Sequence, residues 1–123
     1  HTQYSICEGA IKIDDLKNYC KTNKVGCIGL SDTHNLSGAL EFSENISKQG
    51  TKPLIGTQIR FKHLEEIGLL TLLAKNEIGY KKIIELSSKS FINNTSLSDP
   101  YCNIYNECLE YYEYLYSKKV CIN

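Results

Sequence analysis

The sequence predicts an α/β fold in which a mainly parallel sheet carries helices on its outside. Short apolar runs alternate along the chain with segments of helical periodicity, and this alternation is typical of strand–helix–strand units. Such units wind in a right-handed sense. At 123 residues, the chain provides one domain at most and possibly part of one.

Two helices and a strand are expected in the first half of the chain. Asp14 can cap a helix that ends near Asn23, because apolar residues recur between them with helical spacing. Residues 25–30 form a short apolar run that predicts a buried strand. Asn35 is a good N-cap for the second helix, which ends before Gly50.

The second half begins with two predicted strands and a third helix. One strand covers residues 53–61, and the other runs from Leu69 to Ala74. The second is unbroken in its apolarity, which predicts burial on both faces. Asn76 caps the third helix.

The last part of the chain is expected to continue the same domain less regularly. Residues 93–100 are polar and rich in turn formers, so they predict a loop between residues 1–92 and the rest. A helical segment around 104–116 and a possible strand at 120–122 follow.

Composition limits what this segment can do alone. Lysine plus arginine and aspartate plus glutamate number 14 each, so the formal net charge is zero. A segment that binds nucleic acid by itself usually carries more basic than acidic residues, because basic side chains face the phosphates. Six tyrosines between residues 101 and 116 could form a base-stacking platform, but without interleaved basic residues they indicate helix packing. We therefore expect any DNA contact to be supplied mainly by something other than this segment.

The cysteines and the hydropathy pattern indicate a cytoplasmic protein. No Cys-x-x-Cys pair occurs, so a zinc ribbon is not expected, and the long amphipathic segments do not resemble a disulfide scaffold. Reduced, mostly buried thiols are expected instead. No apolar run approaches the roughly 20 residues that span a bilayer, so neither a membrane segment nor a membrane partner is expected. The six cysteines are Cys7, Cys20, Cys27, Cys102, Cys108 and Cys121.

Four sequence blocks, in order, resemble the PHP (polymerase and histidinol phosphatase) domain that begins the bacterial DNA polymerase III alpha subunit. The blocks cover residues 1–10, 31–42, 52–56 and 72–80. The resemblance covers residues 1–92 well and 93–123 loosely. It implies a distorted β/α barrel, of which this chain supplies the first part. About four or five strands do not close such a barrel, so an open edge is expected at Leu69–Ala74 or at residues 120–122.

The resemblance also implies a role. The parent protein would be a DNA-directed DNA polymerase, a nucleotidyltransferase of DNA replication whose magnesium-dependent active site lies outside this chain. The PHP segment would be a scaffold without catalysis of its own. Its implied partners are the remainder of the polymerase alpha subunit, the proofreading exonuclease subunit and other replicase subunits.

Relatives with an intact PHP site hold zinc or manganese ions between histidines and carboxylates, which activate a water for attack on a phosphate ester. Three residues here match ligand positions: His1, Glu8 and Asp32. His1 matches the second histidine of the His-x-His motif of the family, whose first histidine would precede the chain. Plain polar roles remain open for His1, and helix capping remains open for Asp32.

Two other ligand positions are replaced. Thr33 stands where the Asp-His-Gly motif of the family has histidine, His34 stands at its glycine, and Gln58 replaces the glutamate of Gly-x-Glu. The sequence therefore predicts a degenerate site and no metal cofactor for this chain. His34 is expected at the surface of a loop, and His63 in a solvated polar hairpin.

Two alternatives remain open at this point. One is a free-standing metal-dependent phosphoesterase of the histidinol-phosphatase type, which would need the replaced ligands. The other is a decayed or truncated reading frame whose product never functions alone. The block at residues 72–80 favours the replicase branch over the first alternative.

Overall fold

A computed structural model of the chain describes residues 1–63, 66–92 and 102–103, with the backbone alone for residues 62, 63, 66, 102 and 103. The helices are α1 (Ile13–Asn23), α2 (Ala39–Ser47) and α3 (Glu77–Ile92). The strands are β1 (Cys27–Gly29), β2 (Asp32–Thr33), β3 (Lys52–Leu54), β4 (Gly56–His63), β5 (Glu66–Leu73) and β6 (Cys102–Asn103). The predicted loop at 93–100, the helix around 104–116 and the strand at 120–122 lie outside the described residues.

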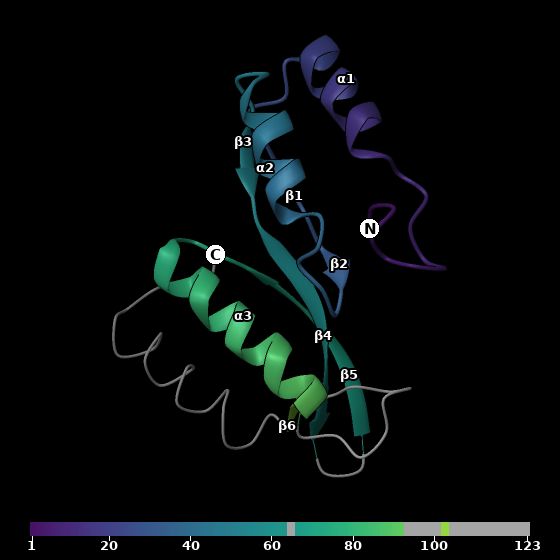
Figure 1. Cartoon of the computed structure of the whole chain (residues 1–123), viewed down its shortest axis with the longest axis vertical. Coiled ribbons are helices and arrows are strands. Elements are labelled where there is room, and N and C mark those ends of the chain that lie inside the picture. Colours follow the sequence, from purple (N-terminus) through teal and green to yellow (C-terminus); the bar gives the residue numbers. More distant parts are fainter. Residues whose placement is uncertain (64–65, 93–101, 104–123) are drawn as a thin grey trace.

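The described strands form two sheets (Figure 1). β1 pairs in parallel with β3 beside α1 and α2, whereas β4 is the central strand of the other sheet. β4 pairs in parallel with β2 and with β6, and antiparallel with β5. The predicted α/β class is confirmed, and the described strands form no closed barrel.

The prediction of mainly parallel strands is wrong for the longest pairing. β4 and β5 pair antiparallel along their whole length, from Gly56 opposite Leu73 to His63 opposite Glu66. Only two residues separate His63 from Glu66, which suffice for a hairpin but not for the crossover that parallel strands require. His63 therefore lies at the end of a hairpin strand, as expected.

The strand predicted over residues 53–61 is two strands, because the chain crosses from one sheet to the other at Ile55. The backbone N–H of Leu30 donates to the Leu54 carbonyl at 2.8 Å. The next carbonyl, that of Ile55, accepts from the N–H of Ala74 at 2.7 Å. Successive carbonyls thus bind different neighbours, and β3 and β4 belong to different sheets.

Each sheet has its own apolar core. Ile13 of α1 and Phe42 and Ile46 of α2 are fully buried in the larger core, which also contains Leu30. The second core contains Ile59 and Phe61 of β4, with Leu72 of β5 and Leu86 of α3 packed against them. α3 thus covers one face of the β4–β5 hairpin (Figure 1).

The prediction that Leu69–Ala74 is buried on both faces is wrong. Ile67, Leu69 and Leu73 remain about half exposed on the face of β5 opposite to α3. Within the described part of the chain, β5 pairs with β4 alone and is an outer strand of its sheet. This is one of the two positions expected for an open edge, and the other, at residues 120–122, lies outside the described residues. Unbroken apolarity was a poor guide here because it arises equally in a strand that has one covered and one open face.

Two of the predicted helix starts can be checked against capping geometry. α1 begins at Ile13 with Lys12 as its N-cap, so Asp14 lies in the first turn and is not the cap. An acidic residue there still interacts favourably with the helix dipole. The prediction for α3 is confirmed, since the Asn76 side-chain oxygen accepts a hydrogen bond from the N–H of Gly79 at 2.9 Å.

The described cysteines Cys7, Cys20 and Cys27 are free thiols. Cys20 is buried as expected, but Cys7 and Cys27 are exposed, so the expectation of burial is wrong for these two. None of the helices in the described part of the chain has the length and apolarity needed to cross a bilayer.

Replacing Gly56 by alanine should destabilise the chain, because the added Cβ would lie 2.2 Å from the Leu72 carbonyl oxygen and 2.6 Å from Leu73 Cδ2. We expect a loss of about 1–3 kcal/mol in the free energy of unfolding, measured by urea titration. Gly26→Ala is the matched control, since nothing lies within 4 Å of its Cβ. Equal effects of the two substitutions would contradict the close contact of β4 with β5 at Gly56.

Candidate functional site

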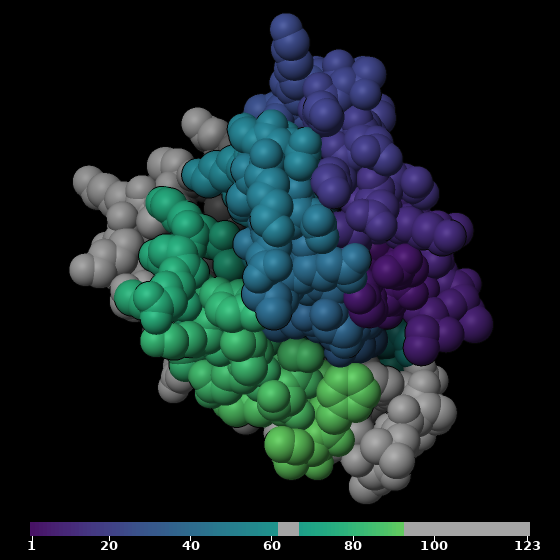
Figure 2. Space-filling model, turned by 45° about the horizontal axis from the view of Figure 1, so that its top comes forward, coloured from purple at the N-terminus to yellow at the C-terminus, as the bar shows by residue number. Residues whose placement is uncertain are grey.

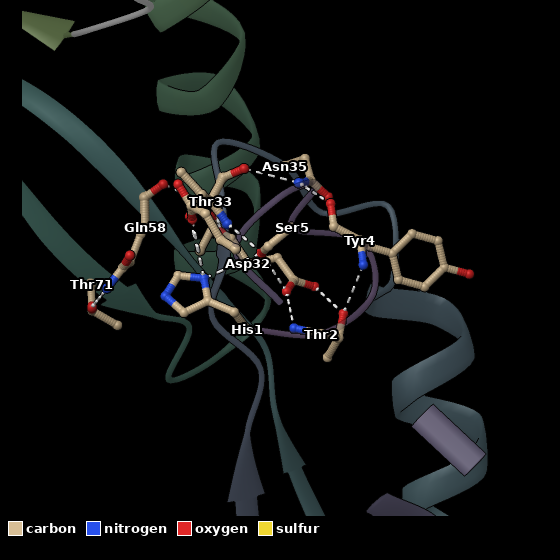
Figure 3. Close-up of polar contacts among 11 residues, drawn as sticks. His1, Thr2, Tyr4, Ser5, Asp32, Thr33, Asn35, Gln58 and Thr71 are labelled. Carbon is tan, nitrogen blue, oxygen red and sulfur yellow. Dashed lines mark hydrogen bonds and ion pairs between the residues drawn. The ribbon is translucent and has the colours of Figure 1, made fainter. Parts of the chain in front are cut away.

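The N-terminal segment is held against β2 by the buried carboxylate of Asp32 (Figure 3). The backbone N–H of Thr2 donates to Asp32 Oδ1 at 2.5 Å and the Thr2 hydroxyl donates to Oδ2 at 2.7 Å. The hydroxyl of Ser5 donates to Oδ1 at 2.8 Å. Asp32 therefore binds the preceding segment and does not cap the helix that follows it.

This anchoring brings His1 and Glu8 together beside Thr33. His1 Nδ1 lies 3.7 Å from Glu8 Oε2 and 3.3 Å from the Thr33 hydroxyl oxygen. The Thr33 hydroxyl donates a hydrogen bond to the Glu8 carboxylate. Cys7, with φ +66°, turns the chain so that Glu8 faces back towards β2. The residue in the histidine position of the family motif thus bridges two predicted ligands.

The second replaced position lies next to the first. Thr33 is in register with Gln58, and Gln58 is in register with Thr71. Residues in register point to the same face of a sheet, so the three form a polar row across β2, β4 and β5 (Figure 3). The Gln58 amide donates to the Thr71 hydroxyl at 3.1 Å and is turned away from His1 (Figure 3).

The described residues do not fit the metal cluster of relatives with an intact site. A zinc site normally takes at least three protein ligands, and a cluster needs more. His1 and Glu8 lie together, whereas both oxygens of Asp32 accept hydrogen bonds from Thr2 and Ser5. Among the described residues, no group of three or more His, Cys, Asp or Glu side chains is placed to hold a metal ion.

The expectation that His34 lies at the surface is wrong, since its exposed fraction is 8%. Its backbone N–H donates to the Gln58 carbonyl at 2.8 Å, and its Nε2 accepts from the N–H of Arg60 at 3.3 Å. The His34 ring packs edge-on against the ring of Phe91 in α3, with 6.1 Å between the ring centroids. The Ser87 hydroxyl donates a hydrogen bond to the backbone carbonyl of His34. His34 therefore binds the edge of β4 beyond the end of β2 and packs beneath α3.

One feature of the sequence indicates this role. His34 occupies the glycine position of the family motif, and its φ of +55° lies in the left-handed region that favours glycine. In this chain the His34 ring points into the fold, towards the N–H of Arg60 and the ring of Phe91. A large residue at a glycine position was thus the sign of a new internal contact.

Burial lowers the pKa of His34 below its usual value near 6.5, and the positive charge of Arg60 lowers it further, while Glu8 opposes them. Since Nε2 accepts from Arg60, the neutral ring carries its proton on Nδ1. That atom is buried and has no hydrogen-bond partner in the described part of the chain. The neutral ring fits this position, and the protonated ring does not.

The N-terminal segment, in purple, lies beside the blue segment that contains α2 (Figure 2), and a second contact fixes it there. The Tyr4 hydroxyl donates to Glu41 Oε2 at 2.5 Å, and the pKa of Tyr4 is raised by this hydrogen bond and then by burial. Asn35 donates to the Tyr4 carbonyl at 3.0 Å, and its side-chain oxygen accepts from the N–H of Ser37. The predicted N-cap role of Asn35 is wrong, since α2 begins at Ala39 with Gly38 as its cap.

Comparison with known proteins gives the family of the chain. The PHP domain family matches residues 1–123, and the chain belongs to this family. It is 37% identical over 103 residues to the DNA polymerase III subunit alpha of Borreliella burgdorferi, covering 75% of this chain and 9% of that protein. It is 35% identical over 100 residues to the subunit of the same name from Campylobacter jejuni, covering 75% of this chain and 8% of that protein.

A relative of the same name from Thermus aquaticus is 35% identical over 106 residues, covering 75% of this chain and 9% of that protein. The chain therefore spans less than a tenth of the length of these curated relatives.

Asp32→Asn should destabilise the chain by about 1.5–3 kcal/mol, because an amide group would face the three donors of Thr2 and Ser5. Urea titration measures the loss. Asp15→Asn removes the same charge at an exposed position of α1. It should lower the free energy of unfolding by less than about 1 kcal/mol. Similar losses in both variants would contradict a structural role for the Asp32 carboxylate.

Stability should also depend on His34 at acid pH. Because the pKa of His34 is lower in the folded than in the unfolded chain, the unfolded chain binds the extra proton more readily below about pH 6.5. This contribution to the free energy of unfolding is constant above that pH and falls below it. His34→Gln keeps an acceptor but does not titrate. Urea titrations at about pH 7.5 and 5.5 should show a larger acid loss for the natural chain than for His34→Gln; equal losses would contradict this assignment.

Proposed function

We propose that this chain is the PHP segment of a replicative DNA polymerase of the DNA polymerase III alpha type, with a structural role and a degenerate metal site. Relatives at 35–37% identity that bear this name support the first part. The second part is supported by one observation above all. The only predicted carboxylate ligand on β2, Asp32, is occupied by hydrogen bonds from the N-terminal segment.

The replaced positions support the same conclusion. Thr33 and Gln58 lie side by side where a histidine and a glutamate would supply a nitrogen ligand and a negative charge. A hydroxyl and an amide supply neither the charge nor the affinity that neighbouring divalent cations need. The polar row instead makes hydrogen bonds within the protein, from Thr33 to Glu8 and from Gln58 to Thr71.

A scaffold of this kind acts by packing against other parts of its assembly. We infer that the remainder of the alpha subunit is its first partner, and that the proofreading exonuclease and other replicase subunits dock through the same assembly. The open sheet supports the view that the chain forms the first part of a distorted β/α barrel, since its outer strand leaves apolar side chains exposed. DNA contact and magnesium chemistry belong to other regions of the parent protein.

The alternative of a PHP phosphoesterase receives no support from the described residues. Such an enzyme must bind metals that polarise a phosphate ester and activate water. His1 and Glu8 are too few donors for that task, and Asp32 is directed at Thr2 and Ser5.

After dialysis, the purified chain should retain no stoichiometric zinc or manganese by elemental analysis, and it should not hydrolyse an aryl phosphate. The physical reason is the shortage of charged donors around Thr33 and Gln58. Glu8→Ala is the control for a residual site. A tightly held metal, or turnover that disappears in Glu8→Ala, would favour the phosphoesterase alternative over the degenerate site.

The identity of the parent protein is tested by isolating from its source the polypeptide that contains this segment. Mass spectrometry of the denatured, gel-separated chain should find it on a polypeptide of the relatives' length, together with peptides of a polymerase domain. Recovery of the segment only on a short polypeptide would contradict the proposed parent.

A further inference from the structure

Lysine residues gather at one end of the structure, in two segments that contain no acidic residue. The segments are residues 16–31, which include most of α1 and all of β1, and residues 45–55, which include the end of α2 and all of β3. Neither contains an aspartate or a glutamate. The zero net charge of the whole chain therefore includes a local excess of positive charge on these segments. It is carried by Lys17, Lys21, Lys24, Lys48 and Lys52.

The fold brings the two segments together. α1 and α2 end at the same end of the molecule, where β3 begins (Figure 1). The Thr51 hydroxyl donates to the Val25 carbonyl at 2.8 Å, and the N–H of Lys52 donates to the Gly26 carbonyl at 2.9 Å. Lys24 and Lys52 are therefore neighbours across this junction. The exposed lysines here, which we call the lysine end, are Lys21, Lys24, Lys48 and Lys52.

The lysine end differs from α3 in how its charges are paired. On α3, Lys81 pairs with Glu77 at 2.7 Å. Lys82 and Lys89 both pair with Glu85, at 2.8 and 3.1 Å. Within the described part of the chain, the lysine end makes no ion pair with a carboxylate. Its charges therefore face solvent without compensation.

The helix dipole accounts for only some of these lysines. Lys21 lies in the last turn of α1 and Lys48 is the C-cap of α2, where a cation interacts favourably with the dipole. Lys52 begins β3, so it belongs to no helix end. Lys17 lies one turn before Lys21 on α1, and like charges at this spacing destabilise a helix. An anionic partner would relieve the repulsion that remains.

We propose that the lysine end binds a short acidic segment of a partner protein. Aspartate and glutamate carboxylates supply the complementary charge. Each exposed ion pair is weak, but one segment that pairs with several lysines adds their contributions. Lys21 and Lys24 are three residues apart, so carboxylates that recur about once per helical turn match them.

The surroundings of the lysine end favour an acidic protein segment over nucleic acid. Asp14 and Asp15 are exposed in the first turn of α1, and Glu44 is exposed one turn before Lys48. A nucleic acid carries phosphates along its whole length, so its backbone would continue past the lysines to these carboxylates. A short acidic segment can end before it reaches them.

The binding should be weak and sensitive to salt, because salt screens interactions between exposed charges. This inference does not depend on the polymerase assignment or on the metal site. Peptide binding tests neither of them, so a negative result would leave both proposals unchanged.

Fluorescence anisotropy of a labelled peptide of about ten glutamates, titrated with the full 123-residue chain, tests the proposal. The peptide should bind at about 0.05 M salt and at least about tenfold more weakly at about 0.5 M. A peptide of glutamines should not bind. In NMR spectra of the same titration, the amide signals of Lys21, Lys24 and Lys52 should shift. No binding at the low salt concentration, or shifts confined to other residues, would overturn the proposal.

Paired substitutions of equal charge locate the binding site. Lys21→Gln with Lys52→Gln should weaken peptide binding about tenfold or more. Lys81→Gln with Lys82→Gln removes the same charge from α3 and should weaken it about threefold or less. All four side chains are exposed, so both variants should keep the circular dichroism spectrum of the natural chain. Equal losses in the two variants would refute binding at the lysine end.

The same assay distinguishes two other occupants. A DNA duplex of about 20 base pairs that binds more tightly than the peptide, and is lost in Lys21→Gln with Lys52→Gln, would assign the lysines to nucleic acid. Glutamine at Glu107, Glu110 and Glu113, which lie outside the described residues, should leave peptide binding unchanged. A gain of about tenfold would assign the lysines to this acidic segment of the chain itself. Either outcome would overturn the proposal.

Discussion

The buried carboxylate of Asp32 is the contact on which the N-terminal half of the structure depends. It binds the backbone of Thr2 and the hydroxyls of Thr2 and Ser5, and these contacts bring His1 and Glu8 beside Thr33. A buried carboxylate is stable only when its oxygens accept hydrogen bonds, so the segment and the strand require each other. In an active PHP site, an aspartate here would direct its charge at metal ions. In this chain the hydrogen bonds within the protein satisfy it instead.

His34 has a comparable role on the other side of β2. Its ring accepts from the edge of β4 and packs on Phe91, so one residue connects the loop before α2 with the sheet and with α3. The left-handed backbone makes this possible, and glycine could not supply the ring. Thr33 and His34 are neighbours, and both make contacts within the protein. Thr33 contacts Glu8, and His34 contacts Arg60 and Phe91.

The sequence predicted the α/β class and the third helix with its Asn76 cap. These features depend on local periodicity, capping chemistry and turn length, which neighbouring residues determine. It did not predict that β3 and β4 part at Ile55, nor that the apolar strand β5 keeps one face open. Those features depend on which distant segment covers a strand. The apolarity of a strand alone does not predict which segment that is. In the site, the resemblance located His1, Glu8 and Asp32, but only the geometry shows that Asp32 faces Thr2 and Ser5.

We propose that these residues stabilise the fold through internal hydrogen bonds and not through metal binding. The thermal midpoint of the purified chain, measured by circular dichroism with chelator and again with excess manganese or zinc, tests it most directly. A ligand that binds only the folded chain raises the midpoint, and the rise grows with the logarithm of the free ligand concentration once that concentration exceeds the dissociation constant. The same midpoint is expected in all three conditions, because no metal binds the folded chain. A rise with either metal that is lost in Glu8→Ala would contradict it.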